Sequence, residues 1–193
     1  MSSIVSLEIG GSSFATTIKG TNLEIEGFEH LKNIITAENL EPTSISLTGG
    51  SLADEITLTG EGDATISGLD GDDYIVSDSG NDTLLGGDGN DTIIGGSGAD
   101  LIKGGMGADV LQGGEGDDVF EFMAEEFASD AIDRIEDFED MGDMIKIMGV
   151  GEDSTVSYDE VTGMVSIDGE AVIDIGEGMD VEATKTDDTW ELF

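Results

Sequence analysis

Apolar residues recur at every ninth position in the middle of the chain, and no insertion interrupts this spacing between residues 68 and 121. The segment divides into six nonapeptides, which begin at Gly68, Ser77, Gly86, Gly95, Gly104 and Gly113. Their eighth position is always apolar: Ile75, Leu84, Ile93, Ile102, Leu111 and Phe120. Side chains alternate between the two sides of a strand, so each repeat predicts a short strand with its eighth side chain on one side. We therefore expect the eighth positions to stack into an apolar interior.

Glycine and aspartate occupy two further fixed positions of the repeat. The fourth position is always glycine: Gly71, Gly80, Gly89, Gly98, Gly107 and Gly116. The sixth position is always aspartate: Asp73, Asp82, Asp91, Asp100, Asp109 and Asp118. Glycine permits positive φ angles and the close approach of neighbouring backbones, so the first six residues of each repeat predict a tight turn. Stacked units of one turn and one strand indicate a solenoid.

A weaker pattern continues upstream of residue 68. The segment from Gly49 keeps the Gly-Gly, aspartate (Asp54) and apolar positions, whereas the segment around Asp63 is one residue out of step. Isoleucines recur about every ten residues: Ile35, Ile45, Ile56, Ile66 and Ile75. We therefore expect degenerate coils from about residue 34, preceded by short strands at 4–9, 13–19 and 23–25 and a helical piece at 26–33. His30 lacks an acidic or nucleophilic partner motif, so we expect a surface or capping residue.

The charge of the chain narrows the possible partners. It carries 45 acidic and 6 basic residues, with a formal net charge of −39. Such a chain either stays disordered or binds cations, and the regular apolar positions favour bound cations. Nucleic acids and anionic membranes are poor partners for this charge. Cysteine is absent, which excludes disulfides and thiolate zinc sites, and no run of 18 apolar residues predicts a membrane span.

The loop aspartates point to calcium. Hard cations such as Ca²⁺ take six to eight oxygen ligands from carboxylates and carbonyls, and glycine turns can aim several carbonyls at one point. Without cations, carboxylates stacked about 4 Å apart would repel by roughly 4 kcal/mol per pair at an effective dielectric of about 20. Repeated along two loop edges, that repulsion would exceed the usual stability of a domain, about 5–15 kcal/mol. We therefore expect metal-bound turns rather than a metal-free solenoid.

The nonapeptides resemble the RTX repeat, Gly-Gly-x-Gly-x-Asp-x-apolar-x, of hemolysin-type calcium-binding proteins that bacteria secrete. The resemblance implies an all-β fold: a right-handed parallel β-roll with two nonapeptides per turn and several calcium ions between loops two repeats apart. Carried onto this chain, the paired aspartates would be Asp73 with Asp91, Asp91 with Asp109, Asp82 with Asp100, and Asp100 with Asp118.

The resemblance also implies that carbonyls at the second and fourth positions complete the calcium shells. The glycines concerned are Gly71, Gly80, Gly87, Gly89, Gly96, Gly98, Gly105, Gly107, Gly114 and Gly116. Two repeats depart from the Gly-Gly opening, because Leu69 follows Gly68 and because Ser77-Asp78 replaces both glycines. Calcium occupancy at that end of the array stays open, as does metal binding at Asp54 and Asp63.

The nonapeptide rule stops after Phe120. Residues 121–131 predict a short helix or loop, and residues 133–147 resemble the Ile-x-Asp-Phe…Gly-Asp-x-Ile segment that follows the repeats in RTX proteins. This resemblance implies a strand-rich cap over the open end of the roll, which an exposed solenoid end requires. Asp137 and Asp143 either hold another calcium ion or are solvated carboxylates. Alternating segments at 156–158, 164–167 and 171–175 predict hairpins.

Export by a type I route is the predicted localisation, and the type I secretion apparatus is a predicted partner. The first residues lack the basic and apolar blocks of a cleaved signal peptide. The final segment, Asp187-Asp188-Thr189-Trp190-Glu191-Leu192-Phe193, is similar to uncleaved C-terminal signals of type I exporters, and it also reads as a last strand. We divide the chain into an N-terminal β-rich cap or irregular solenoid coils (1–48), the RTX calcium-binding β-roll (49–122) and a C-terminal capping and type I secretion region (123–193).

The sequence favours a secreted calcium-binding module with a structural or accessory role. His-Glu-x-x-His and Gly-x-Ser-x-Gly motifs are absent, so we expect no enzyme. A module that binds extracellular polysaccharide or a cell surface is the alternative, and an enzyme with a site in residues 119–193 is a third reading. Val76, Leu85 and Ile94 are apolar on the outer face, and we expect a flanking segment or a partner chain to cover them.

Overall fold

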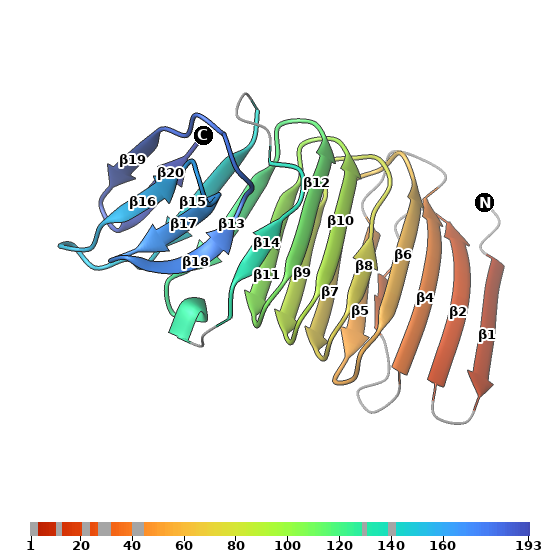
Figure 1. Cartoon of the computed structure of the whole chain (residues 1–193). Helices are drawn as coiled ribbons and strands as arrows, with labels where there is room; N and C mark the ends of the chain where they lie inside the picture. Colours follow the sequence, from red (N-terminus) through yellow and green to blue (C-terminus); the bar gives the residue numbers. More distant parts are fainter. Residues whose placement is uncertain are drawn as a thin grey trace.

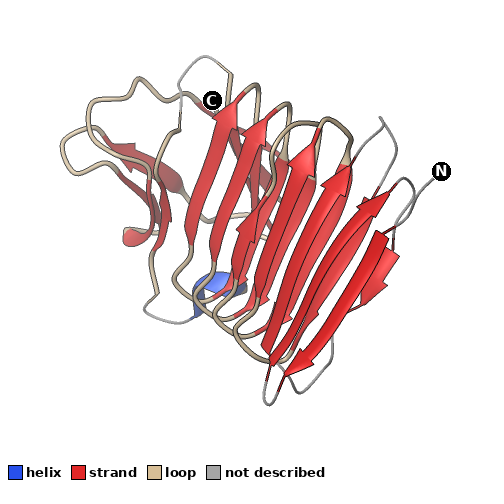
Figure 2. Cartoon of the chain, turned by 90° about the vertical axis from the view of Figure 1, so that its right-hand side faces the viewer, coloured by secondary structure: helices blue, strands red, loops and turns tan. Residues whose placement is uncertain are grey.

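The structure is a computed structural model that describes residues 4–10, 13–20, 24–26, 32–39, 45–128, 131–138 and 142–193. These residues form a parallel β-solenoid whose strands alternate between two facing sheets (Figures 1 and 2). The all-β prediction is therefore confirmed. Among the described residues, no helix is long and apolar enough to cross a membrane.

The two sheets run through the whole molecule. In spatial order, the first sheet contains β1 (Ile4–Gly10), β2 (Ser13–Gly20), β4 (Lys32–Asn39), β6 (Glu55–Gly60), β8 (Tyr74–Val76), β10 (Thr92–Ser97), β12 (Val110–Glu115), β14 (Asp133–Ile135), β18 (Glu170–Asp174), β17 (Met164–Ile167) and β16 (Val156–Asp159). The second sheet contains β19 (Ala183–Thr186), β20 (Thr189–Leu192), β15 (Met144–Met148), β13 (Val119–Met123), β11 (Leu101–Met106), β9 (Thr83–Asp88), β7 (Ala64–Asp70), β5 (Ile45–Gly50) and β3 (Glu24–Glu26).

Two nonapeptides make one turn of the solenoid. In the first sheet, Ile93 lies opposite Ile75 on one side and Leu111 on the other, and each partner is 18 residues away. In the second sheet, Ile102 lies between Leu84 and Phe120 in the same register. Alternate repeats therefore feed alternate sheets, as the nine-residue period predicts.

The eighth positions form the core, as predicted. Their side chains have no solvent-exposed surface in any of the six repeats: Ile75, Leu84, Ile93, Ile102, Leu111 and Phe120. The upstream isoleucines Ile35, Ile45, Ile56 and Ile66 are also buried. The core continues into the cap through Ile135, Ile145 and Ile147.

The solenoid begins earlier than the sequence suggested. Strand β2 pairs in parallel with β4 from Ser13 to Gly20, so parallel stacking precedes residue 34, where we expected the first coil. Strand β1 then pairs antiparallel with β2. Both ends of the expected helical piece are strand, because Glu26 lies in β3 and Asn33 lies in β4. The middle of that piece, including His30, lies outside the described residues.

The far end of the solenoid closes by a change from parallel to antiparallel pairing. Strands β14 and β15 extend the two sheets in parallel, and β20 then pairs antiparallel with β15. Strands β16, β17 and β18 form the predicted antiparallel hairpins. A single 3₁₀ turn, η1 (Glu126–Ala128), follows β13, and Phe127 stacks on Phe122 with ring centroids 5.7 Å apart. The reading of the C-terminal residues as a last strand is confirmed, since Leu192 of β20 is buried.

The three apolar residues of the outer face do not form one patch. Val76 and Ile94 are neighbours on the first sheet, whereas Leu85 lies on the second. All three are half-buried. One covering segment could not reach both sheets, so covering by a flanking segment or a partner stays a prediction for each sheet separately.

Candidate metal sites

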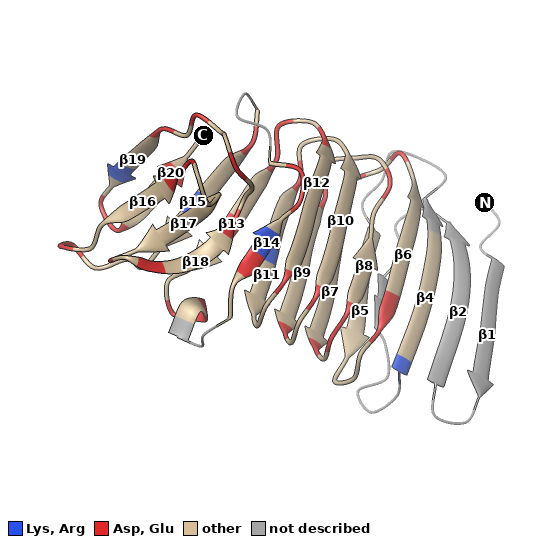
Figure 3. Ribbon diagram, in the orientation of Figure 1, with Lys and Arg blue, Asp and Glu red and all other residues tan. Residues whose placement is uncertain are grey.

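The glycine-rich turns line up along two edges of the solenoid. The first edge contains the turns that lead from the second sheet to the first, at residues 68–73, 86–91 and 104–109. The second edge contains the turns that lead back, at residues 77–82, 95–100 and 113–118. Figure 3 shows acidic residues gathered in the turns at both ends of the strands. The predicted aspartate ligands therefore lie in the turns along the two edges, and the second-position glycines Gly87, Gly96, Gly105 and Gly114 lie near the ends of the adjoining strands.

Sixth-position aspartates of neighbouring coils contact each other along each edge. On the first edge, the backbone N–H of Asp73 donates to Oδ1 of Asp91 over 2.8 Å, and that of Asp91 donates to Oδ1 of Asp109 over 2.8 Å. On the second edge, the backbone N–H of Asp82 donates to Oδ1 of Asp100 over 2.8 Å, and that of Asp100 donates to Oδ1 of Asp118 over 2.9 Å. The structure thus brings together the four predicted pairs, each joined by a backbone hydrogen bond. We call these two series the aspartate ladders.

The second carboxylate oxygen of most ladder aspartates has no partner. Within the described residues, Oδ2 is buried without a hydrogen bond in Asp73, Asp91, Asp100, Asp109 and Asp118. Each of these residues is at most 3% exposed, so water cannot solvate the charge. An unpaired buried carboxylate is costly. A hard divalent cation would supply the missing partner, and these donors therefore fit calcium.

Burial of the carboxylates changes their acidity. Desolvation raises the pKa of Asp73, Asp100 and Asp109 from 3.8 to about 7, although the backbone hydrogen bond that each accepts acts in the opposite direction. It likewise raises the pKa of Asp91 and Asp118 to about 6. Neighbouring carboxylates add to the effect. At neutral pH the ladders therefore favour either a proton or a cation on each oxygen.

The second and fourth glycines allow the turns to stack. Gly105 and Gly107 have φ angles of 108° and 135°, and a Cβ on either would overlap the carbonyl of Gly87 or Gly89 in the preceding coil. The remaining predicted glycines also have positive φ: Gly71, Gly80, Gly87, Gly89, Gly96, Gly98, Gly114 and Gly116. The carbonyls at these positions face the next coil along the edge. This orientation supports their predicted use as ligands. The positive φ favours glycine at these positions, although Leu69 takes the second position of the first repeat with a φ of 83°.

First-position glycines lie beside the unpartnered oxygens, and the sequence-based ligand set omitted them. A Cβ on Gly86 would overlap Oδ2 of Asp91 and would lie 2.5 Å from the carbonyl oxygen of Gly104. Gly95 has the same relation to Asp100 and Gly113. The sequence signal for this space beside the carboxylate was the first glycine of the Gly-Gly opening. That glycine does not have a positive φ, so the turn conformation does not explain why it is glycine.

Three further aspartates extend the ladders beyond the repeats. The backbone N–H of Asp54 donates to Oδ1 of Asp73 over 2.7 Å. The backbone N–H groups of Asp109 and Asp118 donate to Oδ1 of Asp133 over 2.9 Å and to Oδ1 of Asp143 over 3.0 Å, respectively. Burial also raises the pKa of Asp133 to about 7. Each of the three is followed two residues later by isoleucine, which was the available sequence signal.

The aspartates of the capping segment are not solvated loop carboxylates. Asp143 is only 4% exposed and takes a place in the second ladder. Asp137 accepts hydrogen bonds from the backbone N–H groups of Gly113 and Gly114 over 2.9 and 2.8 Å. The solvated reading is therefore wrong for Asp143, and calcium binding at both residues stays a prediction.

An exposed series of hydrogen bonds runs in the opposite direction at the fifth position. The N–H of Asn90 donates back to Oδ1 of Asp72 over 2.8 Å, and the N–H of Ala108 donates back to Oδ1 of Asn90 over 2.9 Å. On the second edge, Asn81 donates to Asp63 over 2.8 Å in the same way. Asp63 therefore belongs to this exposed series and not to the buried ladder.

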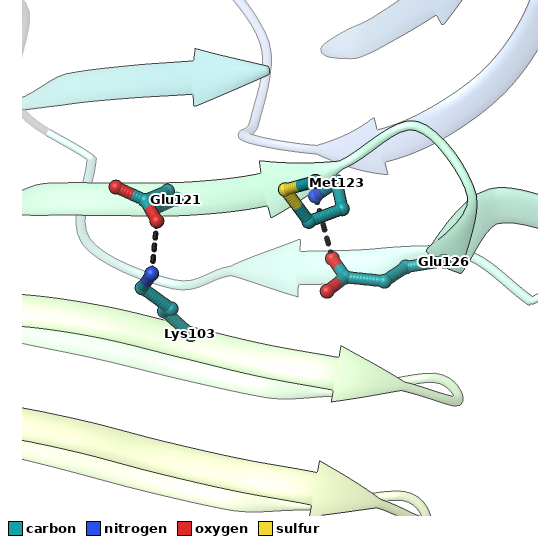
Figure 4. A network of polar contacts seen from close by, with 4 residues as sticks. All are labelled: Lys103, Glu121, Met123 and Glu126. Atoms are coloured by element: carbon teal, nitrogen blue, oxygen red, sulfur yellow. Dashed lines mark hydrogen bonds and ion pairs between the residues drawn. The ribbon is translucent and has the colours of Figure 1, made fainter. Parts of the chain in front are cut away.

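Among the residues that the structure describes, no lysine or arginine forms an ion pair with a ladder aspartate. The ion pairs found within the described residues join Lys103 to Glu121 and Arg134 to Glu136, and neither involves a ladder aspartate. Figure 4 shows the first pair on β11 and β13, beside Glu126, which accepts a 2.7 Å hydrogen bond from the N–H of Met123. In the described part of the chain, no three acidic or histidine side chains converge on one point. A cation on either edge would therefore take most of its ligands from backbone carbonyls.

Comparison with known families agrees with this geometry. Residues 48–84, 58–93 and 85–120 match the family model of the RTX calcium-binding nonapeptide repeat, which comprises four copies of the repeat. The matches together span both turn edges and the strands between them. No curated protein matches the chain.

Proposed function

We propose that this chain, whose residues 48–120 are RTX calcium-binding repeats, is an extracellular β-roll that folds when calcium fills its two turn edges. The five buried, unpartnered Oδ2 atoms carry the proposal. Ions bound there add folding free energy, since the sites do not exist in the unfolded chain.

Five of the ladder aspartates and the turn glycines would hold the ions. Each of the five presents an unpartnered Oδ2, while its Oδ1 accepts the backbone N–H of the neighbouring coil: Asp73, Asp91, Asp100, Asp109 and Asp118. Carbonyls at the second and fourth positions face the adjacent coil, and the first-position glycine leaves room beside Oδ2. Bound calcium would supply the positive charge that the chain, at −39, does not supply itself.

A calcium concentration that differs across the cell envelope would couple folding to export. Each site at 100 times its dissociation constant adds about 2.7 kcal/mol to stability, and sites without calcium add nothing. The chain would stay unfolded for a type I exporter and fold outside the cell. The similarity of the C-terminal residues, now found in the β19–β20 hairpin, to type I signals supports this route. We retain the division at residues 48 and 122 as part of the proposal.

Circular dichroism of the whole chain tests the proposal. We expect little β signal at pH 7.5 in excess chelator and a solenoid spectrum after addition of millimolar calcium. Magnesium at the same concentration is the control, and we expect it to substitute poorly because it demands octahedral geometry and retains its waters. A full β spectrum in chelator that calcium leaves unchanged would refute the proposal.

Two alternatives can be compared with the structure. The exposed aromatic residues Tyr74, on β8, and Phe193, in the cap, do not form a row within the described residues, so a polysaccharide-binding face gains no support. The enzyme alternative has one supporting feature, an open cavity of about 530 Å³ in the cap that is lined by Asp117, Asp143, Asp180 and Glu182. Hydrolysis of a glycan by the calcium-loaded chain, lost in Asp180→Asn, would favour it.

A further inference from the structure

The first carboxylate of each ladder differs from those that follow. On the second edge, Oδ1 of Asp82 accepts the N–H of Ala64 over 2.7 Å, and Oδ2 accepts the hydroxyl of Ser77. On the first edge, Oδ1 of Asp54 accepts the N–H of Asn33 over 2.5 Å, and Oδ2 accepts Nδ2 of the same asparagine over 2.9 Å. Both carboxylates are thus satisfied by protein donors. The five carboxylates that follow them in the repeats have an unpartnered Oδ2.

Ser77 occupies the place that glycine holds elsewhere. It is the single non-glycine first residue among the six nonapeptides, and it is only 4% exposed. In the other repeats this residue lies directly beside the unpartnered oxygen; a Cβ on Gly95, for example, would lie 2.6 Å from the carbonyl oxygen of Gly113 and would overlap Oδ2 of Asp100. The serine side chain therefore fills the space beside Asp82 and donates a proton into it.

We propose that Ser77 and Asn33 replace calcium at the first rung of each ladder. Calcium binding then begins at Asp73 on the first edge and at Asp100 on the second. Asp82, although it matches the repeat, is a structural acceptor and not a metal ligand. The inference rests on the proposed calcium binding of the later rungs.

The replacement gives the array a metal-independent end. Coils that end in Asn33–Asp54 and Ser77–Asp82 contacts carry no unpaired buried carboxylate at those positions, so calcium is not required to stack them. They offer a surface on which the first calcium-dependent coil can pair once calcium binds. Ser77 and Asn33 are neutral, so each supplies a hydrogen-bond donor to its carboxylate and leaves the net charge of the edge unchanged.

A matched pair of substitutions on the second edge tests the proposal without altering Ser77. We expect Asp100→Asn to lower the number of calcium ions bound per chain by at least one, measured by equilibrium dialysis with elemental analysis. Asp82→Asn keeps an acceptor for the backbone N–H of Ala64, and we expect it to leave the number unchanged. Equal losses of calcium in the two variants would overturn the proposal.

Substitutions of Ser77 provide the reverse test. Ser77→Gly restores the first glycine of the consensus opening, beside Oδ2 of Asp82, and should raise the count by one ion per chain. Ser77→Ala keeps the Cβ and removes the hydroxyl, so it should gain no ion and should lower the urea midpoint in calcium. Ser97→Gly, at the third position of the next turn on the same edge, is the control and should keep the wild-type count. If wild type binds no calcium, the proposed function fails; if wild type binds calcium and Ser77→Gly folds without an extra ion, only this inference fails.

Discussion

Acidification should replace calcium in folding the roll. The carboxylates with the highest pKa values are Asp73, Asp100, Asp109 and Asp133, each at about 7 in the folded chain against an ordinary 3.8. The folded state therefore binds protons more tightly than the unfolded state. The resulting stabilisation is complete below about pH 4 and is lost as the pH rises through about 7.

The magnitude is sufficient to control folding. A pKa change from 3.8 to about 7 corresponds to about 4 kcal/mol per carboxylate at about 1.4 kcal/mol per unit. If they act independently, four such groups sum to roughly 16 kcal/mol, which exceeds the whole stability of a typical domain, about 5–15 kcal/mol. Calcium-free chain at pH 7.5 should therefore be unfolded, and protonation of the ladders should recover much of the β structure.

The assay is circular dichroism in excess chelator from pH 8 to pH 4. We expect the β signal to appear steeply between about pH 7 and pH 6, because several protons bind together. Calcium-saturated protein, measured in parallel, should stay folded over the same range. Glu170→Gln, which changes an exposed carboxylate on β18 of the cap, should keep the wild-type midpoint. A midpoint near pH 4 would attribute the folding to relief of the overall charge and refute the role of the ladders.

Three further predictions concern single side chains. Asp91→Asn should move the midpoint of acid-induced folding in chelator to higher pH, because it removes an unpaired buried charge, and should lower the urea midpoint in calcium; an unchanged pH midpoint in chelator or an unchanged urea midpoint in calcium would contradict this. Gly107→Ala should lower the free energy of unfolding in calcium clearly more than Gly149→Ala. Both substitutions force alanine to positive φ (about 1–2 kcal/mol), but only at Gly107 does the added Cβ overlap a carbonyl. Equal urea midpoints for the two variants would exclude the steric argument. Phe120→Ala should lower the free energy of unfolding, measured with urea, by about 3–5 kcal/mol, because Phe120 is fully buried. Val161→Ala should lower it by less than about 0.5 kcal/mol, because Val161 is 79% exposed.

The nine-residue period predicted the array of stacked coils because each fixed position of the repeat meets one physical requirement of the fold. Ile75 and its equivalents must enter the core, and Gly107 and its equivalents must stack on a carbonyl. The start of the solenoid was not predictable in this way. Strand β2 pairs in parallel with β4, and neither strand carries the glycine and aspartate turn that marks a coil in the sequence.

The metal ligands were only partly predictable from spacing. Asp133 and Asp143 lie 24 and 25 residues after their ladder neighbours, Asp109 and Asp118, instead of 18, because longer turns join the capping strands. Ser77 departs from the repeat in the sequence, but only its contact with Asp82 shows why the departure is tolerated. Which oxygen of each aspartate is left without a donor depends on the neighbouring coil, and no single repeat contains that information.

The alternation of the repeats between two sheets links repeat number to the geometry of the whole molecule. One nonapeptide advances the chain by half a turn, so loss or gain of a single repeat would leave the stacked turns intact but rotate the cap by half a turn about the solenoid axis relative to the N-terminal coils. Loss or gain of a pair would change only the length. The parity of the repeat count therefore decides which way the two ends face, and duplication in units of 18 residues is the route by which such an array can lengthen while keeping that orientation.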